Sequence, residues 1–245
     1  MVEAAQRLAI MNVAVMLEAN RNVHWEARGW TLVPAFLNGD DLTMLRREAD
    51  RLLDNGALFE QRGSIPNSTT RSDRLDPVID VSPPFAALAR DQRLLRTVGD
   101  LLGGDAQLLK DKFIAKPPGA NGYGTHQDAA YWPGLGIDPH RFLTAILFLD
   151  DSTPLKGAIE CAPGHHGELL TDPDVIADPD EAALGAFETV ETNAGDLLLV
   201  HALTPHRSGP NRSGEMRRTI LFTYGVDARD DLYAVYQRYQ MGLRR

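Results

Sequence analysis

The stretch Gly122-Tyr-Gly-Thr-His-Gln-Asp-Ala-Ala-Tyr-Trp132 holds the residues around which the chain is organised. His126 and Asp128 are two positions apart, so on an extended strand their side chains point to the same face. An imidazole beside a carboxylate is half of a metal site, and a further histidine would complete the 2-His-1-carboxylate set typical of non-haem iron(II). The motif therefore predicts a metal centre whose third ligand lies elsewhere in the chain.

The third ligand is expected to be one of two histidines, His201 and His206, which follow an apolar run. They are five positions apart and would face opposite ways on one unbroken strand, so at most one of them lines a pocket. Pro205 interrupts strand pairing and places His206 at a strand end, where functional side chains are common. The pattern favours His206 as the ligand and His201 as a partly buried strand residue.

A pair of arginines, Arg217 and Arg218, opens a later apolar strand. Neighbouring strand residues face opposite sides, so one guanidinium enters the interior and the other reaches solvent. A buried guanidinium needs an anionic partner, and a dicarboxylic cosubstrate would supply one through a bidentate contact. Strand parity leaves open which arginine is inside, and an ordinary salt bridge is the alternative explanation for the pair.

Short apolar runs separated by Gly and Pro turns dominate the chain after Gly104. Their spacing indicates a barrel or sandwich of β-strands. The expected strands are 107–116, 140–149, 158–162, 189–192, 196–203 and 217–225. Helices are expected after a cap at Asp40 or Asp41 and within 83–102.

The chain is expected to form a single domain of 245 residues. A helical extension (1–22) precedes a region (23–104) that contains an entry strand at 25–37, helices and a binding loop at 60–85. The β core follows at 105–226 and carries an acidic insertion at 173–186 with one helical turn. A polar tail (227–245) ends the chain.

Composition narrows the class of protein. A net charge of −9 argues against a general nucleic-acid or anionic-membrane binder, and no apolar run is long enough for a membrane-spanning helix. The single cysteine, Cys161, excludes an internal disulfide and suits a reducing cytoplasm. We expect a cytoplasmic monomer or homodimer that acts on a small molecule.

Taken in order, the motifs resemble the phytanoyl-CoA dioxygenase family of iron(II)- and 2-oxoglutarate-dependent oxygenases. The matching pieces are His126-Gln-Asp128, Pro163-Gly-His-His166, Gly195-Asp196, His206-Arg-Ser-Gly-Pro-Asn211 and Arg217. The resemblance implies a mainly β fold with flanking helices (α+β), with a double-stranded β-helix (jelly-roll, cupin-like) core. It also implies Fe(II), 2-oxoglutarate and O2 as cofactor and cosubstrates.

The resemblance implies a role for individual residues. His126, Asp128 and His206 would bind iron, and Arg217 would grip the far carboxylate of 2-oxoglutarate, which decides between the two arginines. Thr144 lies where relatives place a hydroxyl near this cosubstrate. The stretch Lys110-Asp-Lys-Phe-Ile-Ala-Lys116 has three lysines on one strand face. Lys112 is the preferred inward cation, and we expect it to contact 2-oxoglutarate.

Four residues are expected to contact the substrate: Gln127, Tyr131, Trp132 and Arg74. Core packing is an equal alternative for Tyr131 and Trp132. The implied reaction hydroxylates an unactivated C–H bond of a small or medium-sized metabolite, such as an antibiotic precursor, a sugar derivative or a phosphonate, and releases succinate and CO2. Retention of Asp128 favours this outcome over halogenation.

Two other functions fit the same residues. A zinc-dependent hydrolase could use the His/Asp/His set, although it would have no use for Arg217 in the pocket. A non-catalytic jelly-roll binding protein would show no thermal response to 2-oxoglutarate even with metal present.

Overall fold

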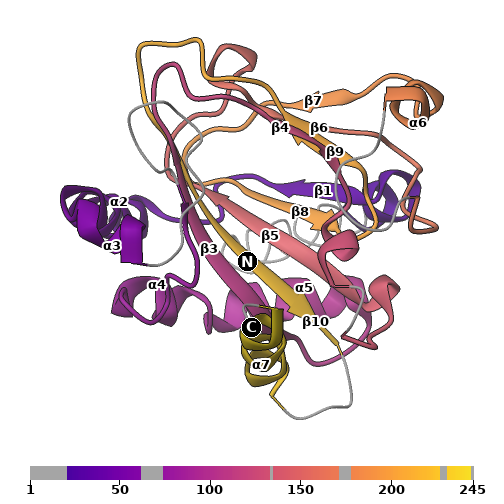
Figure 1. Ribbon diagram of the computed structural model, residues 1–245, viewed down its shortest axis with the longest axis horizontal. Coiled ribbons are helices and arrows are strands. Elements are labelled where there is room, and N and C mark those ends of the chain that lie inside the picture. Colours follow the sequence, from indigo (N-terminus) through magenta and orange to yellow (C-terminus); the bar gives the residue numbers. More distant parts are fainter. Residues whose placement is uncertain (1–20, 62–73, 133–134, 171–177, 227–230, 244–245) are drawn as a thin grey trace, which may run out of the picture.

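The computed structural model describes residues 21–61, 74–132, 135–170, 178–226 and 231–243. Its strands form two facing antiparallel sheets (Figure 1). The larger sheet has the order β1-β8-β5-β10-β3-β2, and the smaller one β4-β9-β6-β7. Strands from both halves of the core alternate in each sheet, which is the double-stranded β-helix that the resemblance implied.

The strand bounds follow the apolar runs. The larger sheet contains β1 (Trp30–Val33), β2 (Arg74–Leu75), β3 (Gln107–Lys116), β5 (Phe142–Phe148), β8 (Leu197–His201) and β10 (Arg217–Gly225). The smaller sheet contains β4 (Tyr123–His126), β6 (Ile159–Cys161), β7 (Glu188–Val190) and β9 (His206–Ser208). The strands expected at 107–116 and 217–225 are confirmed to the residue, and the other four are present but shorter.

The helices are α2 (Gly39–Asp54), α3 (Gly56–Gln61), α4 (Pro83–Leu88), α5 (Gln92–Leu102), α6 (Asp178–Ala183) and α7 (Leu232–Leu243), with short 3-10 turns η1 (Asp128–Tyr131), η2 (Pro139–Arg141) and η3 (Pro154–Lys156). The cap of α2 is Asn38, whose side chain accepts from the Asp41 backbone N–H, so the expected cap at Asp40 or Asp41 was wrong. Gly103 ends α5 in the left-handed conformation.

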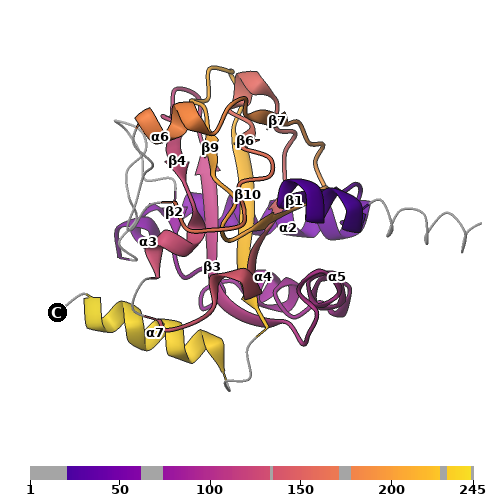
Figure 2. The same cartoon turned by 90° about the vertical axis from the view of Figure 1, so that its right-hand side faces the viewer.

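The two ends of the chain differ from expectation. Residues 21–28 are helical, so the expected entry strand at 25–37 reduces to β1. Most of the expected leader helix, residues 1–20, lies outside the described residues, as does 62–73 of the expected binding loop. The tail forms α7, which packs on β3; Figure 2 shows it beside one end of that strand. No helix in the described ranges is long and apolar enough to cross a membrane.

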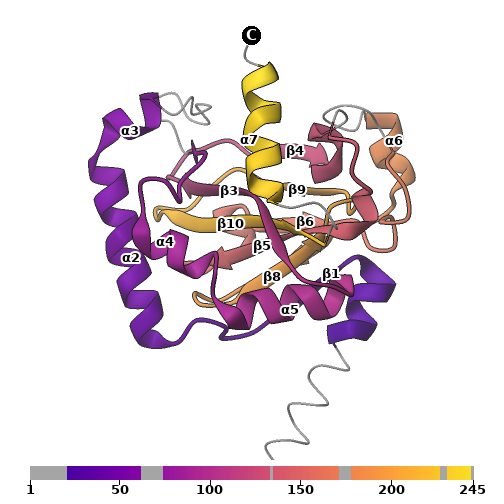
Figure 3. The ribbon, with the colours of Figure 1, turned by 90° about the horizontal axis from the view of Figure 1, so that it is seen from below.

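Alternation along the strands of the larger sheet separates the core from the site. Phe113, Ala115 and Phe222 face the helices α2, α4 and α5, where they join a buried cluster with Leu52 and Leu94. Figure 3 shows these helices over that face of the sheet. The alternate residues point toward the smaller sheet and line the space between the two sheets.

Candidate metal centre

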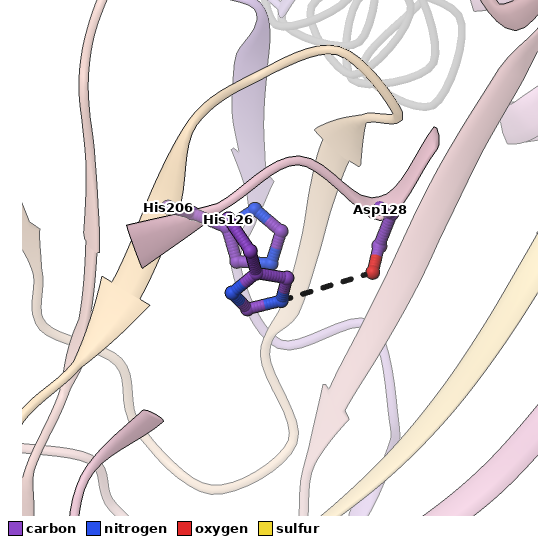
Figure 4. A group of neighbouring side chains, drawn as sticks. All are labelled: His126, Asp128 and His206. Carbon is purple, nitrogen blue, oxygen red and sulfur yellow. Dashed lines mark ion pairs between the residues drawn. The ribbon is translucent and has the colours of Figure 1, made fainter. Parts of the chain in front are cut away.

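Strand pairing brings two histidines together. His126 at the end of β4 is the register partner of His206 at the start of β9, and their ring centroids are 4.2 Å apart. Asp128 follows two residues later, and one donor atom from each of the three residues lies within 4.8 Å of the others. Figure 4 shows both imidazoles beside the carboxylate of Asp128. The structure therefore brings together the three ligands expected from the sequence.

The local backbone differs from the strand parity that first paired His126 with Asp128. β4 ends at His126, and Asp128 begins the 3-10 turn η1. The chain therefore turns after Gln127, and this turn carries the carboxylate to the imidazoles. The expectation of one extended strand through both ligands was wrong, although the two side chains do converge.

Backbone carbonyls fix the tautomer of each histidine. Nδ1 of His126 lies 2.9 Å from the carbonyl of Gly124, and Nδ1 of His206 lies 2.9 Å from the carbonyl of Thr204. A carbonyl only accepts, so each Nδ1 carries the proton and each Nε2 keeps its lone pair. Burial lowers the pKa of His126 to about 3, with the neighbouring His206 as the next cause. The imidazole is therefore neutral near pH 7, as a metal ligand must be.

The carboxylate of Asp128 is oriented by a buried hydroxyl. Thr144 Oγ1 donates to Asp128 Oδ2 at 2.5 Å and lies 3.0 Å from Thr223 Oγ1. The other oxygen, Oδ1, faces His126 Nε2 at 4.0 Å. Although burial opposes it, the nearby Lys112, His206 and His126 and the Thr144 hydrogen bond hold the pKa of Asp128 well below its usual range. Thr144 was expected near the cosubstrate, and in the structure it holds a ligand.

The donor set fits a divalent iron ion. Two imidazole nitrogens and one carboxylate oxygen, all buried or nearly so, converge at ligand spacing. In each of the three residues, a side-chain atom other than the one that would bind the metal is hydrogen-bonded, and this bond orients the side chain as is usual in metal sites.

His201 does not take part in this centre. It ends β8 in the larger sheet, whereas His206 begins β9 in the smaller sheet, so the strand is interrupted before His206 as Pro205 predicted. Nδ1 of His201 accepts from the Leu203 N–H, and Nε2 lies 3.2 Å from the His140 carbonyl. Both nitrogens are engaged in the fold, which agrees with the structural role expected for this residue.

A cavity of about 570 Å³ opens beside the three ligands, between the two sheets. Its lining includes Ile114, Ile146, Ile159, Thr219, Leu221 and Thr223. The volume suits a small molecule together with a cosubstrate.

The arginine pair divides as strand parity requires. Arg217 is 3% exposed, lines the cavity and donates to the carbonyl of Gly157. Arg218 points to the other face and bonds to Asp150 and Asp50. The structure thus places inside the arginine that the resemblance indicated.

Most expected contact residues line the cavity. Those that do are Tyr131, Trp132, Arg74 and Lys112. The ring centroids of Tyr131 and His126 are 5.6 Å apart. Gln127 is directed away from it. Its amide donates to the carbonyls of Glu168 and Leu203 and accepts from the Leu170 N–H, so it braces the 168–170 segment and is not available to a substrate.

Sequence reasoning missed the contribution of α7. Tyr236, Tyr239 and Gln240 line the cavity, as does Lys110 on β3. Lys110 has the same strand parity as Lys112, which was the one available signal. The third lysine of that face, Lys116, lies outside the cavity and bonds to Ser208 and the carbonyl of Gly209.

The fold and the site together define the class of iron(II)- and 2-oxoglutarate-dependent dioxygenases. The phytanoyl-CoA dioxygenase (PhyH) family model matches residues 25–219, and the chain belongs to that family. It is therefore an Fe(II)- and 2-oxoglutarate-dependent dioxygenase.

The relatives are diverse. A methylphosphonate hydroxylase of Gimesia maris is 28% identical over 86% of this chain and 82% of its own length. A 2-aminoethylphosphonate dioxygenase from an uncultured bacterium is 31% identical over 62% of this chain and 58% of its own. The crystal structure of EctD from S. alaskensis with 2-oxoglutarate and 5-hydroxyectoine superposes with a TM-score of 0.78 at 21% identity, covering 85% of this chain and 76% of that one.

Proposed function

We propose that this enzyme hydroxylates an unactivated C–H bond of a small metabolite and releases succinate and CO2. The observation that carries the proposal is the convergence of His126, Asp128 and His206 beside a cavity that Arg217 also lines. Iron bound with 2-oxoglutarate and O2 supplies the oxidant for such a bond. The family membership sets aside the zinc hydrolase and the non-catalytic binding protein.

In this proposal the chain's residues bind, orient and exclude water. His126, Asp128 and His206 would hold the ion, and a set of only three protein ligands would leave coordination positions for 2-oxoglutarate and O2. Arg217 offers a planar, buried guanidinium to the far carboxylate of 2-oxoglutarate. Ile114, Ile146 and Leu221 give the substrate an apolar wall that excludes water from the reacting centre.

The names of the relatives support a small polar substrate. Two are named for phosphonates, and the solved structure contains 5-hydroxyectoine. Both an anionic and a zwitterionic substrate agree with these names.

The test compares ligand variants with a matched control. We expect His206→Ala to abolish succinate release supported by Fe(II), 2-oxoglutarate and O2, because two remaining ligands do not hold the ion. His201→Ala should retain most of that release, since His201 only bonds to backbone groups. Arg217→Ala should raise the KM for 2-oxoglutarate by at least about 10-fold while metal binding persists.

Succinate is measured with and without a panel of candidate substrates, and iron binding by anaerobic absorbance titration. Loss of iron binding in His201→Ala but not in His206→Ala would refute the ligand assignment. An unchanged KM in Arg217→Ala would refute the cosubstrate site.

A further inference from the structure

Three cationic side chains gather on one wall of the cavity. Lys110 and Lys112 alternate along β3 and therefore face the same way. Arg74 comes from β2, where it is the register partner of Ile114, the next inward residue of β3. A cavity in a chain of net charge −9 thus has a positively charged wall.

These charges are only partly compensated within the described residues. Arg74 and Lys110 share one oxygen of Asp76, at 2.6 and 3.4 Å. In the described ranges no carboxylate lies within 4.0 Å of the Lys112 ammonium, and the only acidic residue among those that line the cavity is the ligand Asp128. Asp76 and the metal ligand Asp128 are the carboxylates near these three cations, so at least one positive charge is left in excess. An excess of this kind in a partly buried site is stabilised by a bound anion.

The other cations of the cavity are already engaged. Arg207 pairs with Glu160 and Glu181, and Arg217 is assigned to 2-oxoglutarate. The register of β10 with β3 pairs Arg217 with Lys116 and Leu221 with Lys112. Four residues along β3 correspond to about 13 Å. Arg217 and the Lys110–Lys112 wall therefore start from backbone positions well separated along the cavity, and we assign the first to 2-oxoglutarate and the second to the substrate.

α7 completes this wall with neutral donors. The Lys110 ammonium lies 5.4 Å from the ring centre of Tyr236, and Gln240 donates to the Tyr236 hydroxyl at 3.0 Å. Tyr239 lines the same end of the cavity. Phenol and amide groups beside cations are suited to the remaining oxygens of an oxyanion.

We infer that the substrate carries a doubly negative head group, a phosphonate, phosphate ester or geminal dicarboxylate, which Arg74, Lys110 and Lys112 bind while its C–H bond faces the metal. This rests on the proposed function only for the C–H bond, because the anion site exists whether or not turnover occurs. Lys112, expected from the sequence to serve the cosubstrate, is thereby assigned to the substrate.

Calorimetry of the enzyme with Fe(II) and saturating 2-oxoglutarate, without oxygen, tests the inference. The probes are ethylphosphonate, malonate, propionate and the neutral propionamide. The affinity for ethylphosphonate is corrected for the fraction present as the dianion at the assay pH, so that charge and head-group chemistry are compared separately. We expect the dianions to bind tighter than propionate, and propionamide not to bind measurably. A preference for ethylphosphonate over malonate identifies a tetrahedral head group, and the reverse preference a dicarboxylate.

Variants locate the site. Lys112→Met and Arg74→Met should each weaken dianion binding about 10- to 100-fold and leave the affinity for 2-oxoglutarate within about twofold. Lys112→Arg, which keeps the charge, should retain binding. Lys156→Met is the matched control, because Lys156 pairs with Glu215 and does not line the cavity.

Two results would overturn the inference: propionamide binding as tightly as ethylphosphonate, or Lys112→Met weakening 2-oxoglutarate and not the dianion. Failure of the proposed function looks different. In that case the dianions bind with the expected pattern, but no tested substrate stimulates succinate release.

Discussion

The hydroxyl of Thr144 shows how much a single residue behind a metal ligand can decide. It occupies one oxygen of Asp128 and leaves the other for the ion. Without it the carboxylate could rotate, and a buried oxygen would lose its donor.

Thr144→Val keeps the shape of the side chain and removes this donor. We expect iron affinity to fall about 10- to 100-fold, which is the usual effect of losing such a partner. Thr144→Ser should restore most of it. Anaerobic titration with Fe(II) measures the change, and wild-type affinity in Thr144→Val would show that the hydrogen bond does not orient the ligand.

The pKa of Lys112 predicts that anion binding depends on pH. Burial lowers the pKa of this lysine to about 8, with Lys110 and Arg74 lowering it and Asp128 and Asp76 raising it. The charged form is thus present below pH 8 and lost above it, and a bound anion would raise the pKa again.

We therefore expect the affinity for malonate, which is fully ionised at pH 7, to decrease as the pH rises above about 8. Lys112→Arg should remove this decrease, because guanidinium stays protonated. Calorimetry between pH 7 and pH 9.5 measures it. A decrease that persists unchanged in Lys112→Arg would assign the titration to another group.

At the scale of the elements, the turn before β6 brings the smaller sheet against Arg217 of the larger sheet. Gly157 has φ +70, and its carbonyl accepts from Arg217. A Cβ built there would lie 2.2 Å from the carbonyl oxygen of Gly209 in the loop after β9. Only glycine therefore permits this approach of backbone to backbone.

Gly157→Ala should destabilise the fold by at least about 1 kcal/mol. In a domain of this size each kcal/mol lowers Tm by about 2–4 °C. Gly167→Ala is the control, since nothing lies within 4 Å of its added Cβ. Thermal unfolding of both variants gives the comparison, and equal Tm values would mean that the loops move apart freely.

For the molecule as a whole, the site couples ligand binding to stability. The three residues that bind the metal come from β4, η1 and β9, and residues of β3, β10 and α7 also line the cavity. Ligands that bind only the folded state stabilise it by about 2.7 kcal/mol at 100 times Kd.

Fe(II) and 2-oxoglutarate without oxygen should therefore raise Tm in two steps of several degrees each. Chelator should reverse both steps, because 2-oxoglutarate needs the ion. Arg217→Ala should keep the metal step and lose most of the second. Differential scanning fluorimetry measures this, and a 2-oxoglutarate step without metal would contradict the shared site.

Sequence alone determined the parts of this protein that depend on local periodicity. Alternation along β10 put one arginine of the pair inside, and apolar spacing located β3, β5 and β8. The residue types of His126, Asp128 and His206 also predicted a divalent metal site, because donor chemistry belongs to the residue and not to its position. The choice of iron over zinc came from the ordered motifs of the family and not from the three donors.

Only the tertiary structure decided which distant groups meet. The turn after Gln127 sends that amide away from the cavity, Thr144 finds Asp128 across the fold, and Asp76 joins Arg74 to Lys110. These contacts depend on sheet register, which is set by long-range packing of the whole core. A periodicity fixes the face of a side chain, but its partner on another element is fixed only when the elements pack.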